Sequence, residues 1–236
     1  MSGLSPILLL GDHAGREIPA RLGDLGLSAG DLSRHIACDI GVAGLGRALA
    51  SRLDAPFIHQ RYSRLVIDCN RDQGHEGSIA VQSDGSPVAG NAALGAAERR
   101  RRVRDVFQPY HDQIAVELDA RSAQGRRTIV VSLHSFTPAL GEAPRPWRFG
   151  VLHRNDSAFS RVVLTQLRAL WGQEVGDNQP YAMDDVDFTI PFHAGRRGLD
   201  YLELEVRQDL ITEAPDQIAV ARVLADVLGH ALVINF

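Results

Sequence analysis

Apolar positions along the chain follow two patterns, short continuous runs and a spacing close to that of a helix. The continuous runs are typical of strands covered on both faces, and they predict strands at residues 7–10, 56–59, 65–67, 128–133, 148–152 and 201–206. The helical spacing predicts helices at residues 39–53, 96–123, 156–171 and 215–230. Alternating strands and helices indicate an α/β sandwich whose sheet is at least partly parallel.

Local signals refine these elements. Pro109 lies inside the predicted helix at 96–123 and is expected to kink or split it. Asp156 is expected to cap the helix that follows it, and Pro215 suits the first turn of the last helix. Residues 70–91 are rich in Gly, Ser and Asp and predict a long loop, which in a compact domain is usually functional or mobile. No segment resembles a linker, so residues 1–236 are expected to form a single domain.

Composition narrows the class of protein. The hydrophobic fraction of 44% and the charged fraction of 23% are ordinary for a globular chain, and the net charge of −4 predicts no nucleic-acid partner. All 25 basic residues are arginines, which excludes lysine-based catalysis. Cys38 and Cys69 lack the spacing of a redox pair or a zinc ribbon. The apolar run at 7–10 is too short for a signal peptide or a membrane span, so we expect a cytoplasmic protein without a membrane partner.

Histidines follow two of the predicted strands, at the edge where α/β sheets bind their ligands. His13 comes after the first strand, and His134 comes after the strand at 128–133. Glu17 lies four residues beyond His13, so on a helical turn both side chains would point to one side. Two histidines and one carboxylate, with a fourth position left for water, are typical of a catalytic zinc site.

Further polar residues are expected at the same edge. Glu203 and Glu205 share one face of the strand at 201–206, where a carboxylate is costly unless it is paired or functional. They are interpreted either as partners of Arg207 or another nearby arginine in a salt bridge, or as a general base. Asn70 and Arg71 follow another predicted strand and either hold a substrate carboxylate or form a solvated turn.

The chain resembles the N-formylglutamate amidohydrolase family. The resemblance spans residues 7–212 and is carried by the blocks HAG with IP at 13–19, HIACDIG at 35–41, SRLVIDCNR at 63–71, SLHSF at 132–136, GDNQPY at 176–181 and ELEVRQDL at 203–210. That family is similar to the zinc carboxypeptidases and to aspartoacylase. The resemblance implies a three-layer α/β sandwich with a mixed, mainly parallel sheet. It also implies zinc-dependent hydrolysis of an N-formyl or N-acyl amino acid such as N-formylglutamate.

The resemblance leaves two candidates for the acidic zinc ligand. In the related zinc enzymes the first ligand block reads HxxE. Here Arg16 stands at the third position after His13, and Glu17 comes one residue later. Asp39, at the start of a predicted helix, is the other candidate. The resemblance therefore implies a zinc ion held by His13, His134 and either Glu17 or Asp39.

The other blocks of the resemblance imply roles around the metal. The D-x-N-R block matches residues 68–71, so Asn70 and Arg71 are expected to hold the α-carboxylate of the substrate. Arg64 is expected to help stabilise the oxyanion that forms during hydrolysis.

The block around the last strand implies the identity of the base. It singles out Glu205, rather than Glu203, as the general base, and it adds Arg207 as a substrate-binding candidate. His193 lies in the glycine-containing segment at 192–198 just before this strand, where it is expected to reach the substrate.

Two other functions remain open on the sequence alone. A zinc exopeptidase or peptidoglycan amidase would use the same residues but would need an open groove for a longer substrate. The other is a non-catalytic carboxylate-binding protein that has lost its metal site. Hydrolysis by a serine nucleophile is disfavoured because no GxSxG motif occurs. The sequence does not fix the oligomeric state.

Overall fold

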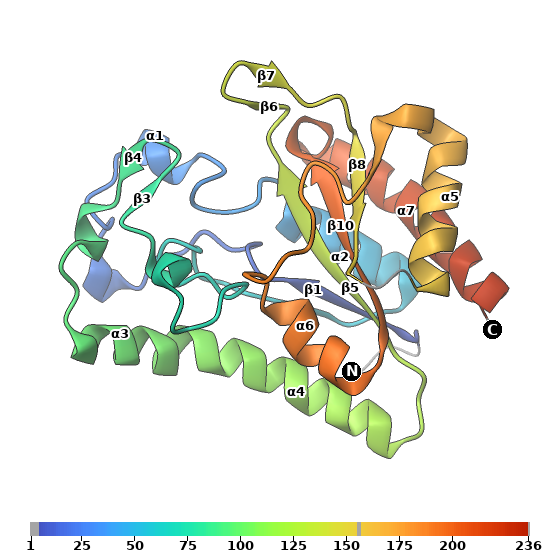
Figure 1. Cartoon of the computed structure of the whole chain (residues 1–236), viewed down its shortest axis with the longest axis horizontal. Coiled ribbons are helices and arrows are strands. Elements are labelled where there is room, and N and C mark those ends of the chain that lie inside the picture. The colour runs from blue at the N-terminus through green and yellow to red at the C-terminus, as the bar shows by residue number, and fades with distance from the viewer. Residues whose placement is uncertain (1–4, 155–156, 236) are drawn as a thin grey trace.

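A central sheet of six strands organises the molecule, in the order β2-β1-β5-β10-β8-β9 (Figure 1). The computed structural model describes residues 5–154 and 157–235. Strands β2, β1, β5 and β10 pair in parallel, β8 runs antiparallel to β10, and β9 runs parallel to β8. The predicted mixed, mainly parallel sheet is confirmed. The strands of the sheet are β1 (Ile7–Gly11), β2 (Phe57–His59), β5 (Ile129–Phe136), β8 (Phe149–Leu152), β9 (Val175–Asp177) and β10 (Asp200–Arg207).

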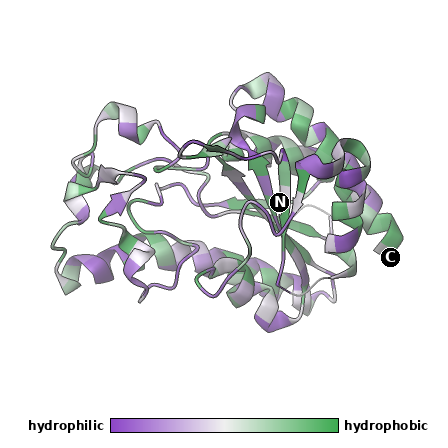
Figure 2. Ribbon diagram, turned by 45° about the horizontal axis from the view of Figure 1, so that its top comes forward, coloured by the Kyte–Doolittle hydropathy of each residue, from purple (hydrophilic) through white to green (hydrophobic). Residues whose placement is uncertain are grey.

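Helices cover both faces of the sheet, which makes three layers (Figure 1). One face packs against α2 (Val42–Leu53), α5 (Ala158–Trp171) and α7 (Ala214–Asn235). The other packs against α4 (Gln108–Ala123) and the short helix α6 (Thr189–His193). Figure 2 shows that hydrophobic positions dominate the strands, whereas the helices alternate between hydrophobic and hydrophilic positions. The smaller elements are α1 (Ala29–Leu32), α3 (Ala96–Arg102), and the strand pairs β3 (Gln82–Ser83) with β4 (Ser86–Pro87) and β6 (Ala139–Leu140) with β7 (Ala143–Pro144).

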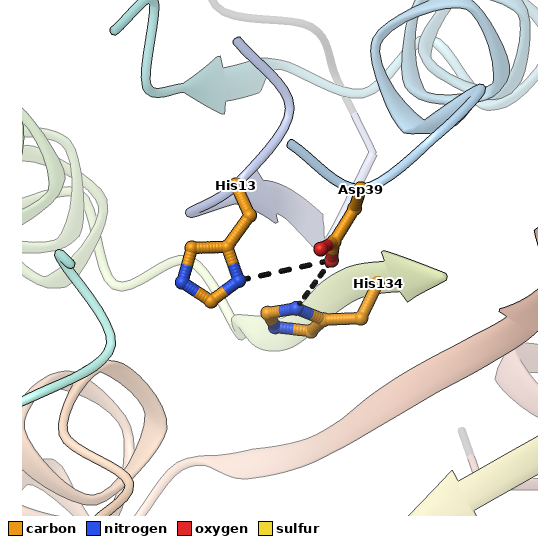
Figure 3. Close-up of side chains that lie close together, drawn as sticks. All are labelled: His13, Asp39 and His134. Carbon is orange, nitrogen blue, oxygen red and sulfur yellow. Dashed lines mark hydrogen bonds and ion pairs between the residues drawn. The ribbon is translucent and has the colours of Figure 1, made fainter. Parts of the chain in front are cut away.

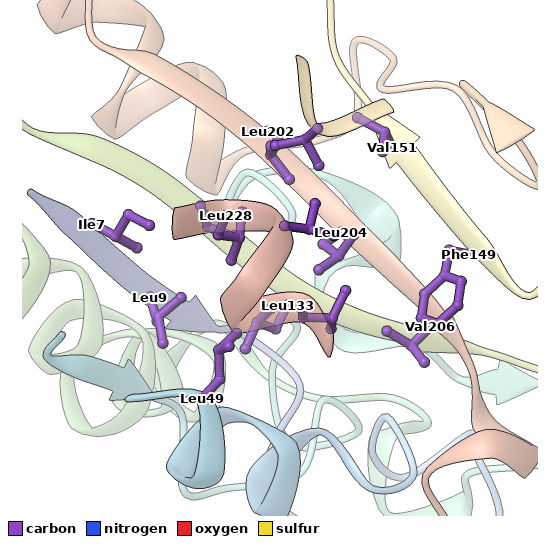
Figure 4. Close-up of a cluster of buried hydrophobic side chains, with 14 of the residues drawn as sticks. Ile7, Leu9, Leu49, Leu133, Phe149, Val151, Leu202, Leu204, Val206 and Leu228 are labelled. Carbon is purple, nitrogen blue, oxygen red and sulfur yellow. The ribbon is translucent and has the colours of Figure 1, made fainter. Parts of the chain in front are cut away.

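Successive residues of a strand point to opposite faces of the sheet, and β10 uses this alternation to separate two environments. Leu202, Leu204 and Val206 are fully buried in the core beneath α2, α5 and α7 (Figure 4). Glu203 and Glu205 occupy the intervening positions and face the other side. One strand therefore contributes both to the apolar core and to a polar cavity.

The predicted strand at 65–67 is wrong, because these residues form a buried turn. Polar side chains bind the backbone there in place of a neighbouring strand. The Leu65 carbonyl accepts a hydrogen bond from Asn91 Nδ2 at 2.8 Å, and the Val66 carbonyl accepts one from Arg102 Nη1 at 2.9 Å. Apolar residues in a turn can be fully buried when side chains satisfy the backbone in this way.

The long predicted helix is helical throughout residues 96–123. A wider, π-helical stretch at residues 103–107, just before Pro109, separates α3, which ends at Arg102, from α4. Helix α5 is capped by Ser157, whose side chain accepts from the backbone of Ser160. Asp156, the predicted cap, lies outside the described residues.

Helix α7 is long and apolar enough to cross a membrane by length and composition, a criterion that the core helix of a globular protein also meets. Ala221, Leu224 and Leu228 on this helix are buried in the core shared with α2 and α5. We therefore describe α7 as part of the helical layer that it forms with α2 and α5 on one face of the sheet.

Candidate active site

Three buried side chains from separate segments converge at the carboxyl end of the sheet (Figure 3). They are His13 just after β1, Asp39 just before α2, and His134 within β5. Asp39 Oδ2 lies 3.0 Å from His134 Nδ1 and 3.7 Å from His13 Nδ1. One ligand atom from each residue fits within 4.8 Å of the others, so the cluster is compatible with a metal ion.

The backbone fixes this convergence. Strands β1 and β5 are neighbours and parallel, which brings His13 and His134 to one edge. The backbone N–H of Asp39 donates to the His13 carbonyl at 2.9 Å, and its carboxylate accepts from the Ser135 backbone at 3.2 Å. Gly41 then turns the chain into α2 with φ at 81°, where a Cβ would lie 2.1 Å from a backbone oxygen. A glycine is therefore required at this position.

The outer nitrogen of each histidine also has a polar neighbour. His13 Nε2 lies 2.7 Å from Asp68 Oδ1, and His134 Nε2 lies 3.1 Å from Ser132 Oγ. Such contacts fix the ring orientation and leave Nδ1 for a metal ion. His13 Nδ1 is buried and has no hydrogen-bond partner among the described residues, as expected of an atom that binds a ligand.

Asp12 lies next to His134 and is itself contacted by Tyr110. Neither residue was singled out from the sequence. Asp12 Oδ2 lies 3.6 Å from His134 Nε2 and has no hydrogen-bond partner among the residues the structure describes. Its other oxygen accepts from the Tyr110 hydroxyl at 2.5 Å. The one available signal was that Asp12 stands beside His13 at the end of β1.

Buried carboxylates give this cluster a negative electrostatic environment that favours a cation. Burial opposes the charge of Asp39, but His13 and His134 still lower the pKa of its carboxyl below the usual value. Burial likewise disfavours protonated His134, yet Asp12 and Asp39 raise the pKa of its imidazole. Asp39 is therefore a carboxylate at neutral pH, and the two histidines lie in a negative environment.

Glu17 does not join the cluster. It is about half exposed, and its carboxylate forms an ion pair with Arg61 at 2.6 Å. After β1 the chain leaves the sheet, and Glu17 forms an isolated β-bridge with Tyr62 outside the strands of the sheet. Of the two acidic candidates, the structure brings Asp39 to the histidines and places Glu17 elsewhere.

The cluster opens into a cavity of about 300 Å³. Arg64 lines it with its guanidinium held between two carboxylates, 2.7 Å from Asp68 Oδ2 and 3.5 Å from Asp39 Oδ1. The cavity is further lined by His35, Asn70, Arg71, Ser135, Phe136, Thr137, Leu152, Tyr181, Ala182, Asp184, Asp187, Glu203 and Glu205.

Glu203 and Glu205 line the cavity without an ionic partner in the described part of the chain. Each has one buried carboxylate oxygen with no hydrogen-bond partner there, Oε1 of Glu203 and Oε2 of Glu205. Burial raises the pKa of Glu203 to about 8 and that of Glu205 to about 7. The alternative of a salt bridge to Arg207 is wrong, because Arg207 pairs with Asp209 at 2.8 Å.

Asn70 and Arg71 both reach the cavity, but an internal carboxylate already contacts them. Asp187 Oδ1 accepts from Asn70 Nδ2 and from Arg71 Nη1, each at 3.1 Å. Asn70 Oδ1 in turn accepts from the backbone N–H of Thr189 at 2.9 Å, which ties the turn to the start of α6. The alternative of a solvated turn is therefore wrong. Asp187 was missed because no local pattern links it to residues more than 100 positions away.

Two predicted substrate contacts lie away from the cavity. His193 is fully buried, and its Nε2 lies 2.9 Å from His111 Nδ1 between α4 and α6. Arg207, the last residue of β10, does not line the cavity and is turned toward Asp209 and the backbone of Trp147. The expectations that these two residues contact substrate are corrected, because helix packing and a local ion pair hold them elsewhere.

Comparison with known proteins supplies the family context. The family model described as N-formylglutamate amidohydrolase matches residues 5–212. The gene product Atu2144 of Agrobacterium tumefaciens has a similar crystal structure, with 37% identity, a TM-score of 0.94, and coverage of 98% of this chain and 92% of that one. The N-formylglutamate amidohydrolase of Ralstonia eutropha JMP134 is similar in fold, with 19% identity, a TM-score of 0.72, and coverage of 100% and 95%. No curated protein sequence gives a significant match.

Proposed function

Because the chain belongs to the N-formylglutamate amidohydrolase family and is thus an amidohydrolase of small amides, we propose that it hydrolyses N-formyl or N-acyl amino acids, such as N-formylglutamate, in a zinc-dependent reaction. The observation that carries the proposal is the convergence of His13, Asp39 and His134 in one cavity with Glu205, whose buried Oε2 has no hydrogen-bond partner among the described residues.

The residues present suit a zinc ion. His13 and His134 would hold it through Nδ1, and Asp39 through its carboxylate, a donor set typical of catalytic zinc. The unpartnered Nδ1 of His13 supports this fit. When bound, zinc supplies Lewis acidity, which makes water more acidic and polarises a carbonyl group.

Glu205 is the general base. It accepts a proton from the water whose oxygen bonds to the formyl or acyl carbon, and it then donates that proton to the nitrogen as the C–N bond breaks. The products are a carboxylic acid and a free amino acid. Burial raises the pKa of Glu205 to about 7, which suits a group that accepts and then donates a proton near neutral pH.

Arginines orient the substrate and its developing charge. Arg71 donates to the α-carboxylate of the substrate, with Asn70 holding the turn that presents it. Arg64 stabilises the oxyanion, because its guanidinium is fixed at the cavity edge by Asp68 and Asp39. Positioned cations of this kind need no reorganisation as charge develops.

The size of the cavity favours a small substrate over the alternatives. A volume of about 300 Å³ lies at the lower end of the range for small-molecule sites, whereas an exopeptidase or peptidoglycan amidase needs a longer groove. A metal-free carboxylate-binding protein leaves the buried histidine cluster without a role. The single domain and the cytoplasmic location expected from the sequence stay predictions.

A hydrolysis screen tests the proposal. Purified protein is stripped with a chelator, restored with zinc, and assayed on N-formyl and N-acetyl amino acids and on the α-amides of the same compounds. We expect zinc-restored turnover of the free acids and little turnover of the amides. Equal turnover of acids and amides would favour the peptidase alternative. No turnover, with no zinc bound, would favour the carboxylate-binding protein.

A further inference from the structure

Arg145 is a buried cation that the proposed chemistry leaves without a role. Of the arginines that the structure describes, three are buried, Arg102, Arg121 and Arg145. Arg102 forms an ion pair with Glu98, and Arg121 forms one with Glu117. Arg145 is 7% exposed and forms no ion pair with any residue that the structure describes. A buried charge is costly unless it is paired, so a ligand anion is the counterion that this arginine lacks.

Neutral contacts hold the guanidinium of Arg145 in place without compensating its charge. Nη1 donates to the Thr137 hydroxyl at 2.9 Å and to the Thr137 carbonyl at 3.3 Å. The guanidinium carbon lies 4.8 Å from the centroid of the Tyr181 ring and 5.9 Å from that of Phe136. Aromatic rings contact the face of a guanidinium group, whereas its N–H donors lie in its plane. Because both hydrogen bonds to Thr137 use Nη1, Nε and Nη2 can form a fork for a carboxylate.

The neighbours of Arg145 connect it to the active-site cavity. Phe136, Thr137 and Tyr181 line that cavity, and Arg145, which does not itself line it, contacts all three. The hairpin of β6 and β7 leads the chain back to the sheet, where the Arg145 backbone N–H donates to the Pro138 carbonyl at 2.8 Å (Figure 1). Tyr181 is 45% exposed, and an exposed side chain changes rotamer readily. This ring can therefore turn to admit a ligand to the guanidinium.

The segment that carries Tyr181 also lies against the proposed base. Gly150 on β8 is paired with Glu205 on β10. A Cβ at Gly150 would lie 2.1 Å from the Gln179 carbonyl oxygen and 3.3 Å from the Glu205 Cβ, so the segment crosses the sheet beside this glutamate. A ligand bound between Tyr181 and Glu205 is therefore within reach of both the base and Arg145.

Two other basic residues of the cavity are less suited to a second carboxylate. Arg64 is already paired with Asp68 at 2.7 Å. The side chain of His35 is 34% exposed, and its Nε2 lies 3.6 Å from Asp84 Oδ2. Burial lowers the pKa of the His35 imidazole, so this group is uncharged at neutral pH. Arg145 is the permanent cation that has no carboxylate of its own.

We infer that Arg145 is a specificity-determining residue that binds a carboxylate on the side chain of the substrate, while Arg71 holds the α-carboxylate. This inference rests on the proposed function and narrows its substrates to N-acyl amino acids with an acidic side chain. The charge of Arg145 then gains its counterion only when the substrate binds. The rings of Phe136 and Tyr181 pack against the methylene groups between the two carboxylates.

Steady-state kinetics of the zinc-loaded protein test the inference. The value of kcat/KM is measured for N-formylglutamate, for N-formylglutamine and for the α-amide of N-formylglutamate. Each amide differs from the acid at one carboxylate, so each ratio isolates one charge. We expect the acid to exceed N-formylglutamine by at least ~10-fold, because a charge-assisted pair in a desolvated site is stronger than a neutral contact. An equal or higher value for N-formylglutamine would overturn the inference while leaving the proposed function intact.

A matched pair of variants tests Arg145 itself. Arg145→Met keeps an apolar stem between the two rings but removes the charge. It should reduce the preference for N-formylglutamate over N-formylglutamine to about 3-fold or less, while the preference over the α-amide stays. Arg148→Met removes an arginine that pairs with Glu174 outside the cavity and should leave both ratios unchanged. Unchanged ratios in Arg145→Met, or a loss of the preference over the α-amide alone, would overturn the assignment.

Two further measurements keep the test decisive. If Arg145→Met does not fold, Arg145→Lys keeps the charge but not the fork and should lose part of the preference, whereas an unchanged ratio would overturn the assignment. Binding of the product amino acids needs no turnover. L-glutamate should raise the Tm of the wild type and of His35→Gln more than L-glutamine does at the same concentration. Loss of this difference in His35→Gln, with its retention in the Arg145 variant, would overturn the inference. Absence of turnover on every N-formyl amino acid would instead remove the proposed function.

Discussion

The two faces of strand β10 are both buried but differ in what burial costs. On one face, Leu202, Leu204 and Val206 are completed by the apolar side chains of α2, α5 and α7 (Figure 4). On the other, Glu203 and Glu205 each keep one carboxylate oxygen that has no hydrogen-bond partner in the described part of the chain. The first face stabilises the fold, and the second face destabilises it unless a ligand or a reaction uses the carboxylates. The comparison therefore separates residues that hold the sheet from residues that carry the chemistry.

Truncating the apolar face should have the largest effect on the free energy of unfolding. Leu204→Ala removes a fully buried side chain, and a change of this kind costs about 2–5 kcal/mol. Urea unfolding of the variant and the wild type would measure it. Glu205→Gln, one position away on the other face, is the matched control and should cost far less. A comparable loss in both variants would contradict the division between the faces.

Removing the Arg71 cation from the cavity should change activity rather than stability. Arg71→Ala should lower kcat/KM on free N-formyl amino acids by roughly 30-fold to several thousand-fold, because losing one member of a desolvated charge pair costs about 2–5 kcal/mol. Arg71→Lys should recover part of it, since an ammonium group cannot bind both carboxylate oxygens in a fork. Steady-state kinetics at unchanged zinc content measures both. Unaltered kcat/KM in Arg71→Ala would remove Arg71 from the site.

Removing the negative charge of Asp12 next to His134 should lower the affinity for zinc, although every proposed zinc ligand remains. Asp12→Asn keeps the shape of the side chain but removes its charge near His134 Nε2, and such changes typically cost about 10–100-fold in metal affinity. Competition with a chelator of known affinity gives the zinc Kd. Tyr110→Phe removes only the hydroxyl that donates to Asp12 and should have a smaller effect. A zinc Kd equal to that of the wild type in Asp12→Asn would contradict this role.

The smallest effect concerns the pH dependence of stability on the polar face. Burial raises the pKa of Glu203 from 4.5 to about 8, so the folded metal-free protein holds a proton that the unfolded chain has released. Stability should therefore fall as pH rises from about 5 to 8. Glu203→Gln cannot ionise, and its loss over this interval should be smaller by at least about 1 kcal/mol. Urea unfolding of the metal-free proteins at both pH values tests this, and equal losses would contradict it.

The same contrast explains what could be predicted from the sequence. The alternation in β10 and the apolar runs in β1 and β5 are local, so the sheet and its two faces follow from the residues themselves. His13 follows β1 and His134 lies near the carboxyl end of β5, and the parallel pairing of these strands brings the two residues together. The resemblance to a family supplied Asp39 as one of two acidic candidates.

Features that depend on distant partners could not be predicted. The sequence at 65–67 predicts a strand, because the side chains that bind the backbone of this turn, those of Asn91 and Arg102, lie far along the chain and leave no local signal. Glu17 lies at helical spacing from His13, but the chain leaves the sheet there and Arg61 takes its carboxylate. The contact of Asp187 with Asn70 likewise joins segments that no periodic pattern connects.

Glu205→Gln tests the central claim most directly, because it removes a proton acceptor while keeping the shape of the side chain. Zinc content and kcat on N-formyl amino acids are measured together for this variant, for Glu203→Gln and for His134→Ala. The account predicts about one zinc per chain in both glutamine variants and none in His134→Ala. It also predicts a fall in kcat of at least ~10²-fold for Glu205→Gln and a much smaller one for Glu203→Gln. Full zinc occupancy in His134→Ala, or near wild-type kcat in Glu205→Gln, would contradict it.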